Sequence, residues 1–177
     1  MFEGLLAVED GDARARLGQY LACLRHWSPR VNLTGAQNEE EAFHTLIRPI
    51  LGAEGFLSNP VIDVGSGNGS PGLILAALRP DVEFTLLEPR AKRWAFLRDA
   101  AREMKVRNVT VRRERSDEYP GPKAATVTMR AVGLDPDALR PLVAPGGCVL
   151  VFGGPELPGA EMLRLPTGST VQRRCFT

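Results

Sequence analysis

A glycine-rich turn with an acidic residue at its entrance is the segment of this sequence best suited to chemistry. Val61, Ile62 and Val64 form a short apolar run, residues 65–72 read Gly-Ser-Gly-Asn-Gly-Ser-Pro-Gly, and residues 73–78 are apolar and helix-forming. A strand, a glycine-rich turn and a helix in this order build a nucleotide-sized pocket at the carboxyl end of a parallel strand. Gly65 and Gly67 let the backbone lie close against a ligand, because no Cβ intervenes.

A carboxylate is expected at the end of the following strand. Residues 82–87 are predicted to form the next strand, and Glu88 follows them directly. A carboxylate in this place can accept hydrogen bonds from the hydroxyl groups of a ribose. The glycine turn and Glu88 together predict a ligand that contains a nucleoside.

Asp63 helps to decide which nucleotide such a turn binds. Gly67-x-Gly69-x-x-Gly72 matches the dinucleotide fingerprint, so a nicotinamide-dependent oxidoreductase is one alternative. Asp63, two residues before the first glycine, would repel a pyrophosphate, whose site needs backbone amides without nearby negative charge. S-adenosyl-L-methionine has no phosphate and carries a sulfonium and an ammonium group. The sequence therefore favours S-adenosyl-L-methionine, and a connecting turn without any ligand is the remaining alternative.

Charge is segregated along the chain and points to a partner. Residues 90–115 hold ten basic and three acidic residues, a net charge of +7, although the whole chain carries only +1. A basic segment beside a methyl-donor site predicts contact with nucleic acid. A solvated helix face is the alternative, because Trp94, Leu97, Ala101 and Met104 give the same segment a core-facing stripe.

The elements that must position these residues alternate along the chain. Helices are predicted at residues 12–27, from 39 to Pro49 with Asn38 as the N-cap, and at 71–78, 91–104 and 136–143; strands are predicted at 61–64, 82–87, 109–112, 125–130 and 147–152. This alternation forces parallel strands with right-handed crossovers. We therefore expect an α/β, Rossmann-like fold of the class I S-adenosylmethionine-dependent methyltransferases, with a mostly parallel sheet and helices on both faces. Residues 169–176 are expected to form one edge strand.

Pockets in such sheets lie beyond the carboxyl ends of the strands. The residues expected there are Gly65, Gly67 and Ser70 after the first strand, Glu88 after the second, Ser116 and Asp117 after the third, and Arg130 at the end of the fourth. The carboxylate of Asp117, or a neighbouring amide, is placed to take an adenine amino group. Arg130 is expected to face the ligand, and a salt bridge from Arg130 to Asp63 or Glu88 is the structural alternative.

The length, hydropathy and cysteines of the chain limit its possible domain organisation and location. With 177 residues, 44% of them hydrophobic, we expect a single domain in which an N-terminal helical segment, residues 1–58, packs on a core of residues 59–177. No apolar run approaches ~20 residues and no signal peptide is visible, so we expect no membrane span and a cytoplasmic location. Cys23, Cys148 and Cys175 are odd in number and widely spaced, which predicts reduced thiols and no metal site, with Cys148 in the core. We expect a monomer.

In this order, these residues resemble the small-subunit (16S) rRNA methyltransferase G family, also called GidB, over about residues 17–154. The resemblance is carried by Trp27 with Asn32-Leu33-Thr34, by the segment from Asp63 to the distinctive Pro71-Gly72, by Arg115-Ser116-Asp117 and by Arg130-Ala131. It implies methyl transfer from S-adenosyl-L-methionine to N7 of a guanine in 16S rRNA of the small ribosomal subunit. It also implies donor contacts at Gly65, Ser70, Ser116, Asp117 and Arg130.

The implied chemistry needs no strong base. Guanine N7 has an in-plane lone pair and no proton to lose, so in-line alignment with the sulfonium methyl group can suffice. Arg130 would then act in catalysis by positioning the substrate, through the RNA phosphates or the O6/N7 edge of the guanine.

Departures from the family pattern leave a second function open. Residues 45–49 read Thr-Leu-Ile-Arg-Pro where the family usually has His-x-x-Asp-Ser, and Gly153-Gly154 stands where the family carries Lys-Gly. Ser70 replaces an aromatic or aliphatic residue, and the short C-terminus predicts that the last strand of the sheet is missing. The alternative is a donor-binding but catalytically weak RNA- or ribosome-associated protein of the same fold.

Overall fold

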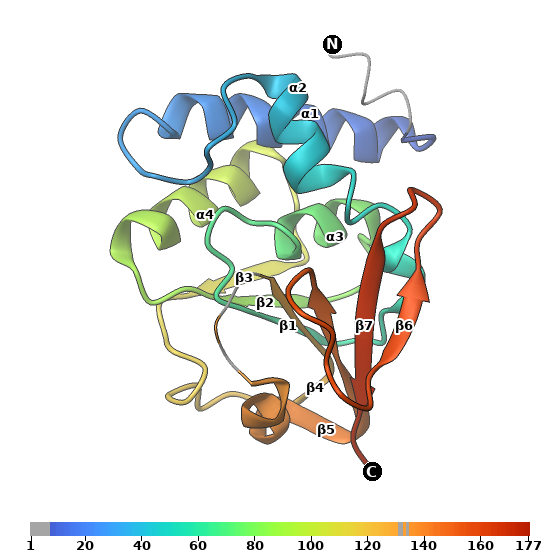
Figure 1. Ribbon diagram of the computed structural model, residues 1–177. Coiled ribbons are helices and arrows are strands. Elements are labelled where there is room, and N and C mark those ends of the chain that lie inside the picture. The colour runs from blue at the N-terminus through green and yellow to red at the C-terminus, as the bar shows by residue number, and fades with distance from the viewer. Residues whose placement is uncertain (1–7, 131–132, 134) are drawn as a thin grey trace.

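The structure, a computed structural model, describes residues 8–130, 133 and 135–177. Its centre is a seven-stranded sheet in the order β3-β2-β1-β4-β5-β7-β6 (Figure 1). Five strands run parallel: β1 (Val61–Val64), β2 (Phe84–Leu87), β3 (Val109–Arg112), β4 (Ala124–Arg130) and β5 (Val143–Phe152). The last two, β6 (Glu161–Arg164) and β7 (Thr170–Cys175), form an antiparallel hairpin, and β7 is antiparallel to β5. The predicted mostly parallel α/β sheet is confirmed.

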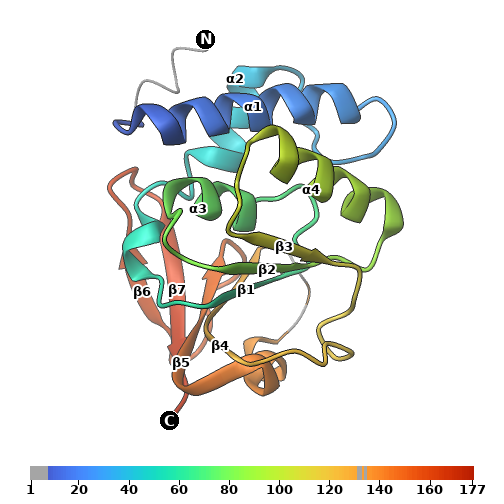
Figure 2. The same cartoon turned by 180° about the vertical axis from the view of Figure 1, so that it is seen from behind.

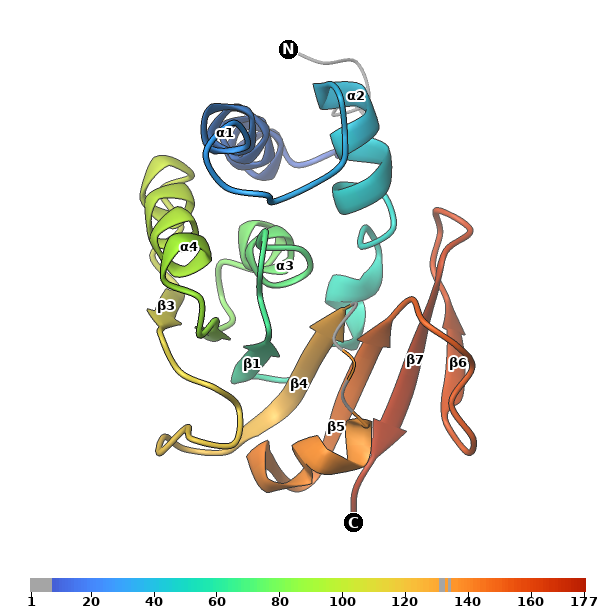
Figure 3. The same cartoon turned by 60° about the vertical axis from the view of Figure 1, so that its left-hand side comes forward.

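The helices form unequal layers on the two faces of the sheet. One face carries α3 (Gly72–Leu78) and α4 (Ala91–Glu103), and α1 (Gly11–Trp27) packs over both of them (Figures 2 and 3). Beside α1 lie α2 (Glu39–Ala42) and a π-helical turn, η2 (Phe43–Ile47), and the 3₁₀ turn η3 (Ala53–Phe56) leads into β1. Across the described chain, the opposite face is covered by a 3₁₀ helix, η4 (Pro136–Leu142).

The capping residues explain where the first two helices begin. Asp10 accepts hydrogen bonds from the backbone amides of Asp12 and Ala13 at the start of α1, and Asn38 accepts one from Glu41 at the start of α2. Short polar side chains at these positions satisfy amide groups that have no partner inside a helix. The prediction that Asn38 caps the second helix is confirmed.

Two buried clusters hold the layers together. The larger cluster lies between the sheet and the helices and includes Leu17, Ile47, Leu73 and Phe96, each fully buried or nearly so. The smaller cluster lies under the other face, where Leu139 of η4 packs with side chains of β1, β4 and β5. All four residues of β1 are buried, and Val61, Ile62 and Val64 are apolar on both faces of this central strand.

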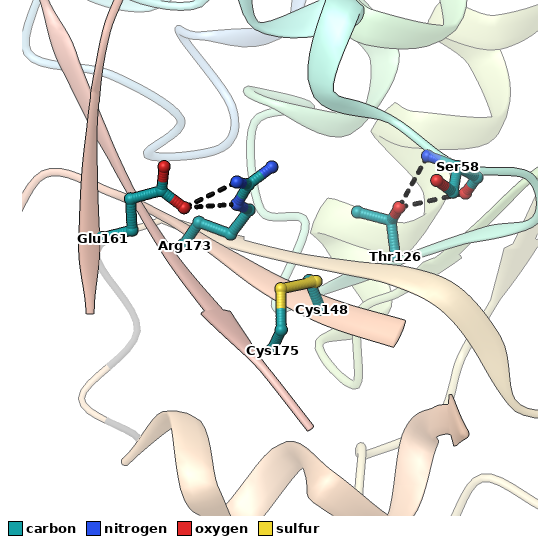
Figure 4. Close-up of a disulfide and its surroundings, with 6 residues drawn as sticks. All are labelled: Ser58, Thr126, Cys148, Glu161, Arg173 and Cys175. Atoms are coloured by element: carbon teal, nitrogen blue, oxygen red, sulfur yellow. Dashed lines mark hydrogen bonds and ion pairs between the residues drawn. A yellow bond between two sulfur atoms is a disulfide. The ribbon is translucent and has the colours of Figure 1, made fainter. Parts of the chain in front are cut away.

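The C-terminal part of the sheet corrects two expectations. Residues 169–176 do not form an edge strand, because β7 lies between β5 and β6, and the sheet does not lack its last strand. The missed strand, β6, is the true edge; it is short and mostly exposed, so it has no apolar run to mark it. Arg173 and Glu161 join the two strands of the hairpin (Figure 4).

The prediction of reduced thiols was wrong for Cys148 and Cys175. Cys148 of β5 and Cys175 of β7 lie directly opposite each other and form a disulfide (Figure 4). Cys148 is only half-buried, so it is not a core residue, and Cys23 is the free, buried cysteine of the described chain. The pairing depends on the register of β7 against β5, which a separation of 27 residues does not reveal.

No helix among the described residues is long and apolar enough to cross a membrane. The beginning of the chain, where no signal peptide was expected, lies outside the described residues. So does Ala131, the second residue of the Arg130-Ala131 pair.

Candidate active site

The glycine-rich turn after β1 has a backbone that favours glycine. Gly67 and Gly69 have φ angles of +51° and +89°, in the left-handed region that side chains disfavour. A Cβ on Gly69 would lie 2.7 Å from Cδ1 of Leu73, and a Cβ on Gly72 would lie 2.6 Å from Oδ2 of Asp63. The predicted strand, tight turn and helix are therefore present, and side chains at these positions would collide with β1 or α3.

Glu88, at the end of β2, fixes the conformation of the turn. Its Oε2 accepts a hydrogen bond from the Gly67 amide at 3.0 Å, and its Oε1 accepts one from the Arg90 amide at 2.8 Å. The side chain is buried, so these bonds are shielded from water. Glu88 thus joins the glycine turn to the start of α4, while the second lone pair of each oxygen remains able to accept a bond from a ribose hydroxyl.

Asp63 of β1 lies behind the glycine-rich turn. The side chain is fully buried, and Oδ1 accepts a hydrogen bond from Oγ1 of Thr128 at 2.6 Å. Oδ2 has no hydrogen-bond partner in the described part of the chain and lies under Gly72. Burial raises the pKa of Asp63 to about 6, although the hydrogen bond from Thr128 opposes the shift. Asp63 is therefore a buried carboxylate behind the turn.

The guanidinium group of Arg130 is hydrogen-bonded to other groups of the protein. Its guanidinium donates to Oγ of Ser70 at 2.6 Å, to the Thr45 carbonyl at 2.5 Å and to the Leu46 carbonyl at 3.4 Å. Ser70 Oγ in turn donates to the Leu46 carbonyl at 2.7 Å. Burial lowers the pKa of Arg130. No ion pair joins Arg130 to Asp63 or Glu88 among the described residues, so Arg130 instead holds η2 against the glycine-rich turn.

A cavity of about 420 Å³ opens beyond the carboxyl ends of β1, β2 and β3. Its described lining is Val64, Gly65, Leu87, Pro89, Glu114, Arg115, Ser116, Asp117, Gly133, Ala138 and Leu139. The structure thus brings Gly65, Ser116 and Asp117 together, whereas Gly67, Ser70, Glu88 and Arg130 are not part of this lining. Apolar walls with a few polar groups at one end suit a flat heteroaromatic ring such as adenine.

One wall of this cavity was not predicted. Ala138 and Leu139 come from η4, which was expected only as a short helix of the fold. The signal that could have found it is the position of η4, directly after the strand that ends at Arg130. At the opposite wall Asp117 is exposed and pairs with Arg115, with 3.1 Å between Oδ1 and Nε.

Solved structures identify the fold. The chain is similar to a SAM dependent methyltransferase from Aquifex aeolicus, with a TM-score of 0.58 and 11% identity over 77% of this chain and 93% of the other. It is also similar to an RNA methyltransferase from Salinibacter ruber in complex with S-adenosyl-L-homocysteine, with a TM-score of 0.52 and 24% identity over 66% and 80%. The fold, with its cavity at the carboxyl ends of the strands, is that of the Rossmann-like S-adenosylmethionine-dependent methyltransferases.

Sequence relatives define the family. The model of the GidB family, rRNA small subunit methyltransferase G, matches residues 13–161. Relatives named ribosomal RNA small subunit methyltransferase G include those of Nitrosococcus oceani, 34% identical over 97% of this chain and 82% of the relative, and of Halorhodospira halophila, 35% identical over 93% and 80%. The chain belongs to the rRNA small subunit methyltransferase G family, as its motifs predicted, and S-adenosyl-L-methionine is its cofactor.

Proposed function

We propose that this protein transfers the methyl group of S-adenosyl-L-methionine to N7 of a guanine in 16S rRNA. The observation that carries the proposal is the family match over residues 13–161, which includes the cavity walls at Gly65, Ser116 and Asp117. We further propose that the protein acts in the cytoplasm as a monomer without a metal ion. In this proposal residues 1–58 form an N-terminal segment of the same domain as the core, residues 59–177.

The proposed donor site has two sets of residues. Gly65, Ser116 and Asp117 would contact the adenosyl part of the donor, since they line the cavity and Asp117 offers a carboxylate to the adenine amino group. Gly67, Ser70, Glu88 and Arg130 would act through the conformation of the turn and through the second lone pairs of Glu88. The bound donor supplies an electrophilic methyl group on sulfur. Because guanine N7 has no proton to lose, alignment alone is the task of the protein.

The basic segment at residues 90–115 is the proposed contact for the rRNA, but only part of it is free to serve. Arg102 pairs with Asp99 and Glu103, and Arg98 stacks on Trp94 with its Cζ 4.8 Å from the ring centroid. These two cations already have partners on α4. They support the view that this part of the helix face is a solvated surface.

Two free cations near the cavity are better placed to bind RNA. Arg90 and Lys92 are exposed and their side chains have no partner in the described structure; Arg90 follows Pro89 of the cavity wall. They stand at the start of α4, which has no acidic residue in its first turn, and the helix dipole disfavours cations there. Lys105 and Arg107, also free, follow the other end of α4, about 20 Å away along the axis, where the dipole favours them.

A matched pair of variants tests the RNA contact. Arg90→Glu with Lys92→Glu should weaken binding to undermethylated small subunits at least about tenfold and lower the salt slope by about 2. The same change should stabilise α4 by roughly 0.5 kcal/mol, because it favours the helix dipole. Lys105→Glu with Arg107→Glu makes the same change in net charge at the far end. Equal losses in both variants, measured by filter binding across a salt series, would show that location does not matter.

The activity itself is tested in two steps. Calorimetric titration with S-adenosyl-L-homocysteine should show binding, and incubation with labelled donor and undermethylated small subunits should show transfer to one guanine. Absence of binding up to about 1 mM, the upper end of the usual range of substrate KM values of roughly 1 μM to 1 mM, would contradict the proposal.

A second candidate function is favoured by one observation. Arg130, expected to position the substrate, is bound by Ser70 and by the carbonyls of Thr45 and Leu46. A donor-binding, RNA- or ribosome-associated protein with little turnover would use the same fold. Binding of S-adenosyl-L-homocysteine without methyl transfer to undermethylated subunits would support this second function over the first.

A further inference from the structure

A buried tyrosine of α1 contacts the donor turn. Tyr20 is fully buried, and its hydroxyl donates a hydrogen bond to the backbone carbonyl of Asn68 at 2.8 Å. Asn68 lies inside the glycine turn, between Gly67 and Gly69. Burial raises the pKa of Tyr20 above its usual value, so the phenol keeps its proton and remains a donor at every physiological pH. The contact joins two segments that are 48 residues apart.

The side chain of Asn68 extends the same connection in two directions. Its Nδ2 donates to the carbonyl of Leu33 at 3.0 Å, and its Oδ1 accepts from the amide of Ser70 at 3.1 Å. Leu33 is buried in the loop that follows α1. Asn68 is therefore held through its backbone carbonyl by α1 and through its side-chain amide by the next loop, while its Oδ1 fixes the amide of Ser70, two residues further along the turn.

Tyr20 and Glu88 bind neighbouring residues of the glycine-rich turn from different elements. Glu88 binds the amide of Gly67 from β2, and Tyr20 binds the carbonyl of the next residue from α1. A turn with successive glycines at positive φ has many other conformations available, and fixing it costs conformational entropy. Because the hydrogen bonds of Tyr20 and Glu88 already hold the turn in one conformation, this entropy does not have to be lost when the donor binds.

We propose that Tyr20 and Asn68 are positioning residues for methyl transfer, which make the N-terminal segment a structural part of the donor site. The inference rests on the proposed function, because it assigns the donor to this turn. Neither side chain lines the cavity, so both act on the donor through the backbone of the turn. An apolar side chain in place of the phenol would leave the Asn68 carbonyl buried without this partner.

The first test is Tyr20→Phe in the full chain. Loss of the hydroxyl should raise the dissociation constant for S-adenosyl-L-homocysteine about tenfold, the usual scale for a buried hydrogen bond. The matched control is Thr126→Val. Thr126 is buried, and its hydroxyl bridges the amide and carbonyl of Ser58 at 2.8 and 3.0 Å, near the amino end of β4 and away from the cavity (Figure 4). Thr126→Val should lower stability in denaturant without changing donor affinity.

The second test is Asn68→Asp, which retains an acceptor for the Ser70 amide but cannot donate to the Leu33 carbonyl. Donor affinity should fall again, and in the transfer assay KM for S-adenosyl-L-methionine should rise while KM for the small subunit stays unchanged. Asn68→Ala removes both bonds and should lower donor affinity further than Asn68→Asp does.

The outcomes separate this inference from the proposed function. If the unaltered protein binds no S-adenosyl-L-homocysteine, the proposed function fails. If it binds, and Tyr20→Phe and Asn68→Asp bind equally well, the inference is overturned and the function stands. The inference is also overturned if Thr126→Val loses as much affinity as Tyr20→Phe at the same loss of stability, because the effect is then general softening of the fold.

Discussion

At the scale of single residues, the fully buried carboxylate behind the glycine-rich turn has a consequence for stability. Asp63 is fully buried, and the Thr128 hydroxyl bonds only one of its two oxygens. Removing a carboxylate from water disfavours its charged form, and the nearby Glu88 adds repulsion. The second oxygen of this carboxylate, Oδ2, lies against Gly72 at the start of α3.

The raised pKa predicts how stability depends on pH. Asp63 has a pKa of about 6 in the folded protein and 3.8 as its ordinary value. Between these values the folded state keeps a proton that the unfolded state has lost, so its contribution is complete below about pH 4 and is lost as pH rises through about 6. The loss amounts to about 3 kcal/mol at about 1.4 kcal/mol per pKa unit.

Asp63→Asn isolates this contribution from those of other carboxylates. The difference in unfolding free energy between the variant and the unaltered protein should shift in favour of the variant from about pH 4 to about pH 7. Urea denaturation at several pH values measures it. A difference that stays constant across this range would show that Asp63 titrates normally in the folded protein.

At the scale of elements, apolar periodicity predicted the helices and strands whose bounds depend on burial. It did not predict contacts that depend on the tertiary fold. The strands β1 and β3 and the long helices α1 and α4 are close to their predicted bounds, because each presents an apolar run or stripe to the core. Of the residues predicted beyond the carboxyl ends of the strands, Gly65, Ser116 and Asp117 line one cavity, whereas Glu88 is not part of its described lining. The roles of Glu88 and Arg130 were not predictable, because their partners are backbone groups brought near by tertiary folding. The cavity wall from η4 was missed, although the position of η4 directly after β4 places it at the same edge of the sheet.

Two leucines of η4 allow its contribution to the cavity to be measured. Leu139 and Leu142 are both buried in the smaller cluster, but only Leu139 lines the cavity. Leu139→Ala and Leu142→Ala should each lower the unfolding free energy by roughly 2–5 kcal/mol. Only Leu139→Ala should also weaken binding of S-adenosyl-L-homocysteine, because it removes a wall of the proposed adenine site. Similar donor affinity in the two variants would place the donor elsewhere.

At the scale of the whole molecule, the C-terminal hairpin is fastened to the parallel sheet and to η4. β7 pairs along β5, Arg174 forms an ion pair with Asp137, and Arg140 lies over the ring of Phe176. The disulfide between Cys148 and Cys175 adds a covalent link at this end of β7. A cysteine count could not reveal it, since the link depends on which residues of two distant strands become neighbours.

The disulfide predicts that the stability of the whole chain depends on redox conditions. A bond that closes a loop of 27 residues restricts the unfolded chain and should stabilise the fold by roughly 3 kcal/mol. Thiol reductants should therefore lower the unfolding free energy of the unaltered protein by this amount. Cys148→Ser with Cys175→Ser should be equally less stable and should no longer respond to reductant, while Cys23 stays in both proteins as an internal control. A similar response to reductant in both proteins, or three titratable thiols in the unfolded, unreduced chain, would contradict the link between β5 and β7.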